Sequence, residues 1–201
     1  MSNAIHTETV GNFTIAIYHD DIPLNPRKDF DPMGKIIMLD QRNYNVGDEK
    51  HNCYDINELY DDIMEDYNPT VIIPVYFYDH GSNGCSIREV GSIDDATGFT
   101  FVSRENLLNE YSVKIATKKA KEKATKVLLG ELETYSQYLN GDVFYYSITD
   151  LQGEIVDSCG GFFGDYDGYI LEEAKRQAEY FENERIKNLH RCEMLNQLGK
   201  M

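Results

Sequence analysis

Positive charge is scarce in this sequence, and tryptophan is absent. The 19 Lys and Arg residues are outnumbered by 35 Asp and Glu residues, which gives a formal net charge of −16 over 201 residues. A surface with this excess of negative charge repels nucleic acid and anionic membranes. We therefore expect protein or cation partners, and we do not expect direct nucleic-acid binding.

Long apolar runs and paired cysteines are lacking as well. No run approaches the roughly 18–20 apolar residues that a membrane-spanning helix needs, and the N-terminus lacks the basic and then apolar order of a signal peptide. The cysteines, Cys53, Cys85, Cys159 and Cys192, form no CxxC pair, so reduced thiols are expected rather than a zinc site or redox dithiol. These absences predict a cytoplasmic protein without membrane association.

The order of the predicted elements indicates one α+β domain over residues 1–201. Apolar patterns predict strands at 13–18, 35–40, 70–78 and 98–102 and a β-hairpin over 142–158. Prolines and acids over 20–34 predict a long loop. No linker divides two cores, so we predict a largely antiparallel sheet with helices packed on one face and a long C-terminal helix.

Two helical segments are predicted to pack on other parts of the protein, the first on the sheet and the second on another subunit. Small apolar residues recur at spacings of three and four from Val113 to Val127 and predict a helix close to the sheet, with Gly130 as its stop. Its six lysines are expected to form a solvated face paired with neighbouring acids, rather than a nucleic-acid contact. The C-terminal helix, over 168–198, would span about 45 Å, longer than a small domain needs. Its end is therefore predicted to form a homodimer contact.

The acids are concentrated between Asp40 and Asp66, where nine acidic residues stand against two basic ones. A short helix capped by Asp55 or Asn57 is expected there, with apolar residues on one face and acids on the other. Such a face favours contact with a basic protein surface. The predicted interaction residues are Asp55, Glu58, Asp61, Asp62, Glu65 and Asp66.

Catalytic chemistry has weaker support in the sequence. Asp79 and His80 follow a buried strand, and Cys85 lies five residues after His80, so a Cys/His nucleophilic pair is conceivable but lacks an orienting third group. Ordinary loop residues are the favoured interpretation. A phosphate-binding interpretation of the glycine-rich segment 160–168 is disfavoured, because Asp165 and Asp167 are better suited to capping the last helix.

Metal binding has two candidate sets. Oxygen ligands for Mg²⁺ could come from Asp29, Asp31 and Asp40, although their spacing does not bring them together. A second set in one loop matches no standard zinc spacing, and a solvated acidic loop is favoured there. No cofactor is predicted, and a divalent metal stays an open alternative. The second set consists of His51 and Cys53 with Asp48, Glu49 and Asp55 nearby.

Six segments, in the same order over about four fifths of the chain, resemble an uncharacterised family of small acidic proteins encoded by bacteriophages, prophages and mobile elements. The chain departs from the family in a shorter loop after residue 82 and in Gly160 or Gly161 at a usual tryptophan. The resemblance implies a phage or mobile-element context in a bacterial host cell and assigns no catalytic residue. The segments are DFDPMGKIIMLDQRNYNVGDE (29–49), YFYDHGS (76–82), GFTFVSRE (98–105), EYSVKIATKKAKEKA (110–124), YLNGDVFYY (138–146) and DSCGGFFGDYDGYILEEA (157–174).

Three functions follow as hypotheses, of which the third, a small-ligand or nucleotide-binding module, would need a concave site lined by Tyr and Phe. The favoured one is a non-enzymatic interaction protein whose acidic surface engages a host or phage protein, in a specific form an inhibitor of a host defence nuclease. The alternative is a metal-dependent hydrolase or nuclease that uses the Asp and His residues named above. Convergence of those carboxylates on one pocket would favour the alternative.

Overall fold

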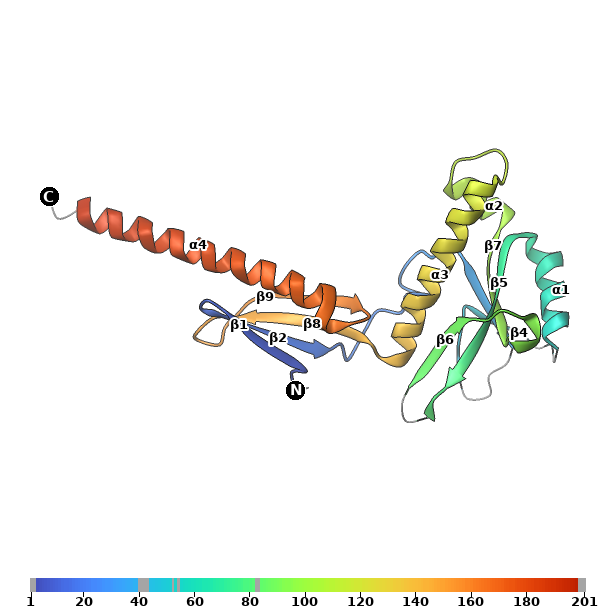
Figure 1. Cartoon of the computed structure of the whole chain (residues 1–201), viewed down its shortest axis with the longest axis horizontal. Helices are drawn as coiled ribbons and strands as arrows, with labels where there is room; N and C mark the ends of the chain where they lie inside the picture. The colour runs from blue at the N-terminus through green and yellow to red at the C-terminus, as the bar shows by residue number, and fades with distance from the viewer. Residues whose placement is uncertain (1–2, 40–43, 52, 54, 82–83, 199–201) are drawn as a thin grey trace. The chain divides into compact units, whose positions relative to one another are not determined.

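The structure is a computed structural model, which describes residues 3–39, 44–51, 53, 55–81 and 84–198 (Figure 1). Its class is α+β, with largely antiparallel strands and a long C-terminal helix, as the sequence predicts. Backbone contacts divide the chain into two compact units. The first contains residues 1–23 and 142–201, and the second contains residues 24–141.

The sheet of the first unit is a four-stranded antiparallel sheet in the order β1-β2-β8-β9. Alternation along β2 places Phe13, Ile15 and Ile17 on one face, where they are buried. The sequence analysis did not identify β1, whose residues are mostly polar. The strands are β1 (His6–Val10), β2 (Phe13–His19), β8 (Val143–Thr149) and β9 (Ile155–Phe163).

One helix, α4 (Leu171–Leu198), covers the apolar face of this sheet after a short π-helical turn, η3 (Tyr166–Ile170). Ala174 and Ala178 are fully buried, because small side chains let the helix approach the strands closely. Figure 1 shows α4 continuing past the end of this sheet. Its described residues from 186 to 196 are all exposed. No helix among the described residues is long and apolar enough to span a membrane.

The sheet of the second unit has five strands in the order β4-β3-β7-β5-β6. All neighbours are antiparallel except β3 and β4, which are parallel. The central strand β7 is buried on both faces, with Phe99 and Phe101 on one and Thr100 and Val102 on the other. The strands are β3 (Lys35–Leu39), β4 (Glu49–His51), β5 (Pro69–Asp79), β6 (Cys85–Glu89) and β7 (Gly98–Ser103).

Helices cover both faces of this second sheet. Helix α1 (Ile56–Tyr67) packs on the face that presents Phe99 and Phe101. Helices α2 (Arg104–Glu110) and α3 (Lys118–Asn140) pack on the other face, over Val102 and its neighbours. A 3-10 turn, η2 (Ile93–Asp95), lies against α1.

Three features differ from the sequence-based expectations in detail. The strands form two sheets rather than one, and the second sheet has helices on both faces, which bury the side chains on both sides of β7. Helix α3 begins only at Lys118, where the Thr117 side chain accepts a hydrogen bond from the amide of Ala120 at 3.2 Å. It continues through Gly130, because buried Leu132 and Tyr135 extend the apolar stripe beyond that glycine.

Candidate functional site

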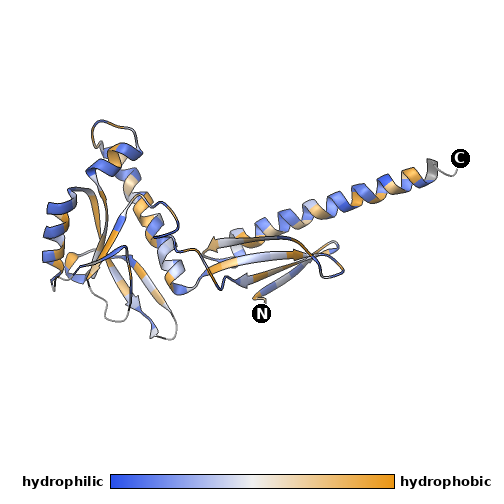
Figure 2. Cartoon of the chain, turned by 180° about the vertical axis from the view of Figure 1, so that it is seen from behind, coloured by the Kyte–Doolittle hydropathy of each residue, from blue (hydrophilic) through white to orange (hydrophobic). Residues whose placement is uncertain are grey.

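Helix α1 presents the acidic residues that the sequence analysis selected. Its N-cap is Asp55, whose Oδ1 accepts a hydrogen bond from the amide of Asn57 at 2.7 Å. Leu59 and Ile63 bury the apolar side of the helix against β7. The acids fall on the opposite side, and Figure 2 shows the hydrophilic side of α1 turned away from the sheet. Asp55, Glu58, Asp61, Glu65 and Asp66 are exposed, and Asp62 is partly exposed.

Two further carboxylates extend this surface. Asp94 and Asp95 are exposed in η2, which lies against α1. The sequence analysis missed them because they stand about thirty residues after α1 in the chain, and only the packing of η2 brings them there. We call Asp55, Glu58, Asp61, Asp62, Glu65, Asp66, Asp94 and Asp95 the acidic face.

Cations do not balance the acidic face among the described residues. Within the described ranges, the one basic side chain at ion-pair distance is that of His51, whose Nε2 lies 3.5 Å from Asp62 Oδ2. Asp62 also follows Glu58 and precedes Asp66 by four residues, a spacing at which like charges repel. The last turn contains Glu65 and Asp66 and no base, so these charges oppose the helix dipole. Glu65 and Asp66 therefore lower the stability of α1, in contrast to Asp55 and Glu58 at its N-terminal end, where the dipole favours an acid.

The catalytic candidates lie around the β5–β6 hairpin. Asp79 and Cys85 are cross-strand partners, and Asp79 Oδ1 accepts a hydrogen bond from the amide of Gly81 at 2.7 Å, which lowers the pKa of Asp79. A hydrogen bond to Asp79 raises the pKa of Tyr44 to about 12. His80 Nε2 lies 2.9 Å from Ser86 Oγ. The imidazole is thus engaged with a serine hydroxyl rather than with the Cys85 thiol.

The metal candidates have separate local roles. Asp29 Oδ2 accepts a hydrogen bond from the amide of Asn25 at 2.7 Å and stabilises a turn of the 20–34 loop. Asp31 lines a pocket, and Asp40 lies outside the described residues. In the second set, Asp48 binds Arg27 and Glu49 binds Lys35 at 2.6 Å. Within the described ranges no three His, Cys, Asp or Glu side chains lie close enough to hold a metal ion.

The second unit contains a buried arginine, Arg27, that the sequence analysis did not identify. The Arg27 side chain is 2% exposed, and its Nε and Nη2 bind the two carboxylate oxygens of Asp48 at 2.9 and 2.5 Å. Its Nη1 lies 3.3 Å from Glu131 Oε2 of α3. Burial by itself lowers the pKa of Arg27, but the hydrogen bonds to Asp48 and the charges of both carboxylates raise it above the ordinary value.

The Arg27 cluster fixes the loop that precedes β3. Glu131 accepts hydrogen bonds from the amides of Met33 and Gly34 at 2.7 and 3.1 Å. Asp48 accepts one from the amide of Ile36 at 2.7 Å. The one sequence signal that could have indicated this cluster is the pair of bases, Arg27 and Lys28, between prolines in a loop rich in acids, since a buried cation needs acidic partners.

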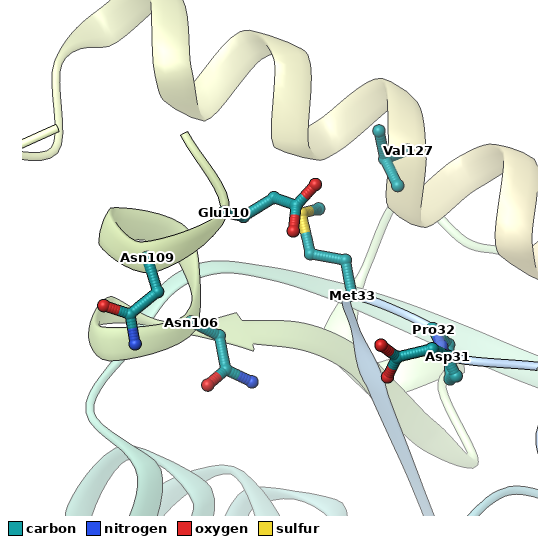
Figure 3. Close-up of a pocket in the computed structure, with 7 residues that line it drawn as sticks. All are labelled: Asp31, Pro32, Met33, Asn106, Asn109, Glu110 and Val127. Atoms are coloured by element: carbon teal, nitrogen blue, oxygen red, sulfur yellow. The ribbon is translucent and has the colours of Figure 1, made fainter. Parts of the chain in front are cut away.

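The fixed loop forms one wall of an open pocket of about 570 Å³ in the second unit (Figure 3). The other walls come from α2 and α3. A smaller pocket of about 320 Å³ shares Pro32, Met33 and Asn106 with it and reaches Arg27 and Lys28. The larger pocket is lined by Asp31, Pro32, Met33, Asn106, Asn109, Glu110 and Val127.

Comparison with known proteins identifies no relative: no family model, curated protein or solved structure matches this chain. The similarity to mobile-element proteins therefore stays an expectation from the sequence. The function has to be argued from the geometry of the chain itself.

Proposed function

We propose that the protein binds a basic surface of a partner protein through the acidic face of α1 and η2. The supporting observation is that acidic residues stand at positions where they lower the stability of α1. Glu65 and Asp66 oppose the helix dipole, and the described part of the chain supplies no Lys or Arg partner to the acidic face. Charges that destabilise the free protein become favourable when a partner contributes cations.

The spacing of the carboxylates favours a partner that otherwise binds nucleic acid. The 12 residues of α1 span about 18 Å, and six carboxylates on or capping that length give about one charge per 3 Å. One strand of duplex DNA has a phosphate about every 3.4 Å. In its specific form, the proposal is therefore that the protein inhibits a nuclease. The proposed origin in a phage or mobile element comes from the resemblance described in the sequence analysis.

The test is a pull-down from bacterial lysate with purified protein. One bait is the wild type, and the second has Asp61→Asn, Asp62→Asn, Glu65→Gln and Asp66→Asn. A matched control removes four exposed charges elsewhere in the same unit, with Glu89→Gln, Glu105→Gln, Glu122→Gln and Glu133→Gln. Both variants have the same net charge, so long-range electrostatics are equal.

The proposal requires a partner that the wild type and the control variant recover and that the α1 variant loses. Binding should also weaken as salt rises, since screening shortens the reach of exposed charges. Recovery of the same partners by all three baits would contradict it. Loss in both variants alike would show that only net charge matters, which also contradicts it.

The alternative, a metal-dependent hydrolase or nuclease, needs carboxylates that converge. Asp29 is used within its loop, His80 is engaged with Ser86, and Asp79 is engaged with Gly81. No observation on the described residues favours this alternative over binding.

A second copy of the chain is the further partner that we propose, through the end of α4. Ile186, Leu189 and Leu195 are 38%, 49% and 59% exposed there. This half of α4 is rich in bases and the preceding half in acids, so antiparallel packing of two helices would pair opposite charges. Leu189→Glu should reduce the mass measured by light scattering, whereas Lys187→Glu at an exposed position beside it should reduce it less.

A further inference from the structure

The larger pocket of the second unit is lined by four exposed polar side chains, those of Asp31, Asn106, Asn109 and Glu110. No hydrogen bond or ion pair of the Asp31, Asn109 or Glu110 side chains is found among the described residues, and Asn106 uses only its backbone amide, which donates to Ser103 at 3.1 Å. Figure 3 shows the carboxylates of Asp31 and Glu110 and the amide of Asn106 around the same space, with Met33 between them. The space therefore offers hydrogen-bond acceptors from two different walls.

No cation of the described chain neutralises the two carboxylates. Arg27 reaches the adjoining pocket, but its charge is already matched by Asp48 and Glu131. The lysines of α3 form no ion pair with Asp31 or Glu110. A ligand for this pocket should accordingly bring a positive charge of its own.

The pocket wall is held in place before any ligand arrives. Glu131 binds the amides of Met33 and Gly34, and Arg27 donates to the carbonyl oxygen of Gly34 at 2.6 Å. The segment that contains Asp31 and Met33 is therefore tied to α3 through buried groups. Such preorganisation reduces the conformational entropy that binding costs.

We propose that this pocket binds an alkylguanidinium group. A guanidinium is planar and has five N–H donors, so it can donate to Asp31, Glu110 and the Asn106 amide oxygen together. The aliphatic stem of the ligand contacts Met33 and Val127, the apolar residues of the lining. A compact ammonium has only three donors on one atom and satisfies two separate carboxylates less well.

This site is distinct from the acidic face, because α1 covers the opposite face of the sheet. The guanidinium can belong to a free small molecule or to an arginine side chain of a protein. Both sources present the same group to Asp31 and Glu110. They differ in that a peptide also has amides on both sides of the arginine.

The experiment is an NMR titration of the full-length ¹⁵N-labelled protein with agmatine, with N-acetylarginine amide and with n-butylamine. Agmatine and the arginine derivative should shift the amide signals of Met33, Asn106 and Asn109. Asp31→Asn and Glu110→Gln should each weaken agmatine binding by about tenfold or more, since each removes a charged acceptor. Glu105→Gln is the matched control, because Glu105 is exposed on the same helix and does not line the pocket.

The relative affinities of these ligands distinguish the two sources of the guanidinium group. Tighter binding of N-acetylarginine amide than of agmatine identifies a protein side chain as the source, and the reverse identifies a free ligand. Equal binding of n-butylamine, an equal loss in Glu105→Gln, or no shifts at the lining residues at about 10 mM ligand would overturn the proposal. The quadruple α1 variant should bind agmatine as the wild type does, so failure of the acidic-face proposal leaves this result unaffected.

Discussion

Helices α1 and α3 cover opposite faces of the same sheet, yet they use their charged residues differently. Helix α3 directs Glu131 inward, where it binds Arg27 and two backbone amides, and its other buried positions are apolar. Helix α1 buries only apolar side chains and directs all its acids outward. Glu131 of α3 thus binds buried groups of the fold, whereas Glu65 and Asp66 in the last turn of α1 have no cationic partner among the described residues.

The lysines of α3 sharpen this contrast. We expected a solvated face paired with neighbouring acids, but among the described residues only Lys118 has a carboxylate partner, Glu122 at 3.9 Å. Lys123 lies over the ring of Tyr111, with Nζ 5.7 Å from the centroid. The exposed charged residues of α1 are therefore all acidic, whereas α3 exposes its lysines together with Glu122 and Glu133.

The largest expected effect tests whether the contact of Glu131 with Arg27 stabilises the fold. Arg27→Met should destabilise the protein by about 3–5 kcal/mol, because Asp48 and Glu131 would lose the cation that they bind in a buried site. Urea denaturation followed by circular dichroism measures the change. Lys28→Met is the control, since Lys28 is exposed and adjacent in sequence. A loss below about 1 kcal/mol would mean that the cluster does not hold α3 to the loop.

An intermediate effect concerns alkaline pH. Tyr135 of α3 accepts a hydrogen bond from the amide of Gly47 at 2.9 Å and is 2% exposed. Burial raises its pKa, so the folded state disfavours the phenolate. The stabilisation is complete below the unfolded value of about 10 and is lost as pH rises from there through the raised folded pKa.

Urea denaturation from about pH 8 to about pH 11 measures this alkaline loss. Tyr135→Phe should remove the contribution of this group, so that its stability falls less steeply over the same interval. The same slope in wild type and variant would show that other groups cause the loss.

The sequence predicted the elements whose local pattern agrees with their tertiary role. Strands β2, β3, β5 and β7 and the capped helix α1 were identified, because apolar periodicity determines which of their faces is buried. The division into two sheets was not predicted, because strand pairing over more than 120 residues, as between β2 and β8, leaves no local signal. Likewise the acids of α1 were found as a periodic set, whereas Asp94, Asp95 and the pocket depend on packing alone.

A smaller effect tests why α3 does not end at Gly130, where the sequence analysis placed its end. Gly130 lies inside the helix, and a Cβ there would meet no atom within 4 Å. Gly130→Ala should therefore stabilise the protein by about 0.5–1 kcal/mol. Gly141→Ala is the opposite case, because Gly141 ends the helix with φ +79 and an alanine there would be strained. Destabilisation by both changes would indicate a bend at Gly130 that the helix requires.

An effect of similar or smaller size bears most directly on function. Glu65→Gln with Asp66→Asn removes two charges that oppose the dipole of α1 and repel Asp61 and Asp62, so the pair should raise the free energy of unfolding by up to about 1 kcal/mol. Glu105→Gln is the matched control: its acid lies in the first turn of α2, where the dipole favours it, so its loss should lower stability by about 0.3 kcal/mol. Higher stability together with weaker partner binding is the combination that a surface kept for recognition should give. If the α1 pair instead lowers stability, its carboxylates have a favourable role within the folded chain, and the contrast between the two helices no longer supports a binding function.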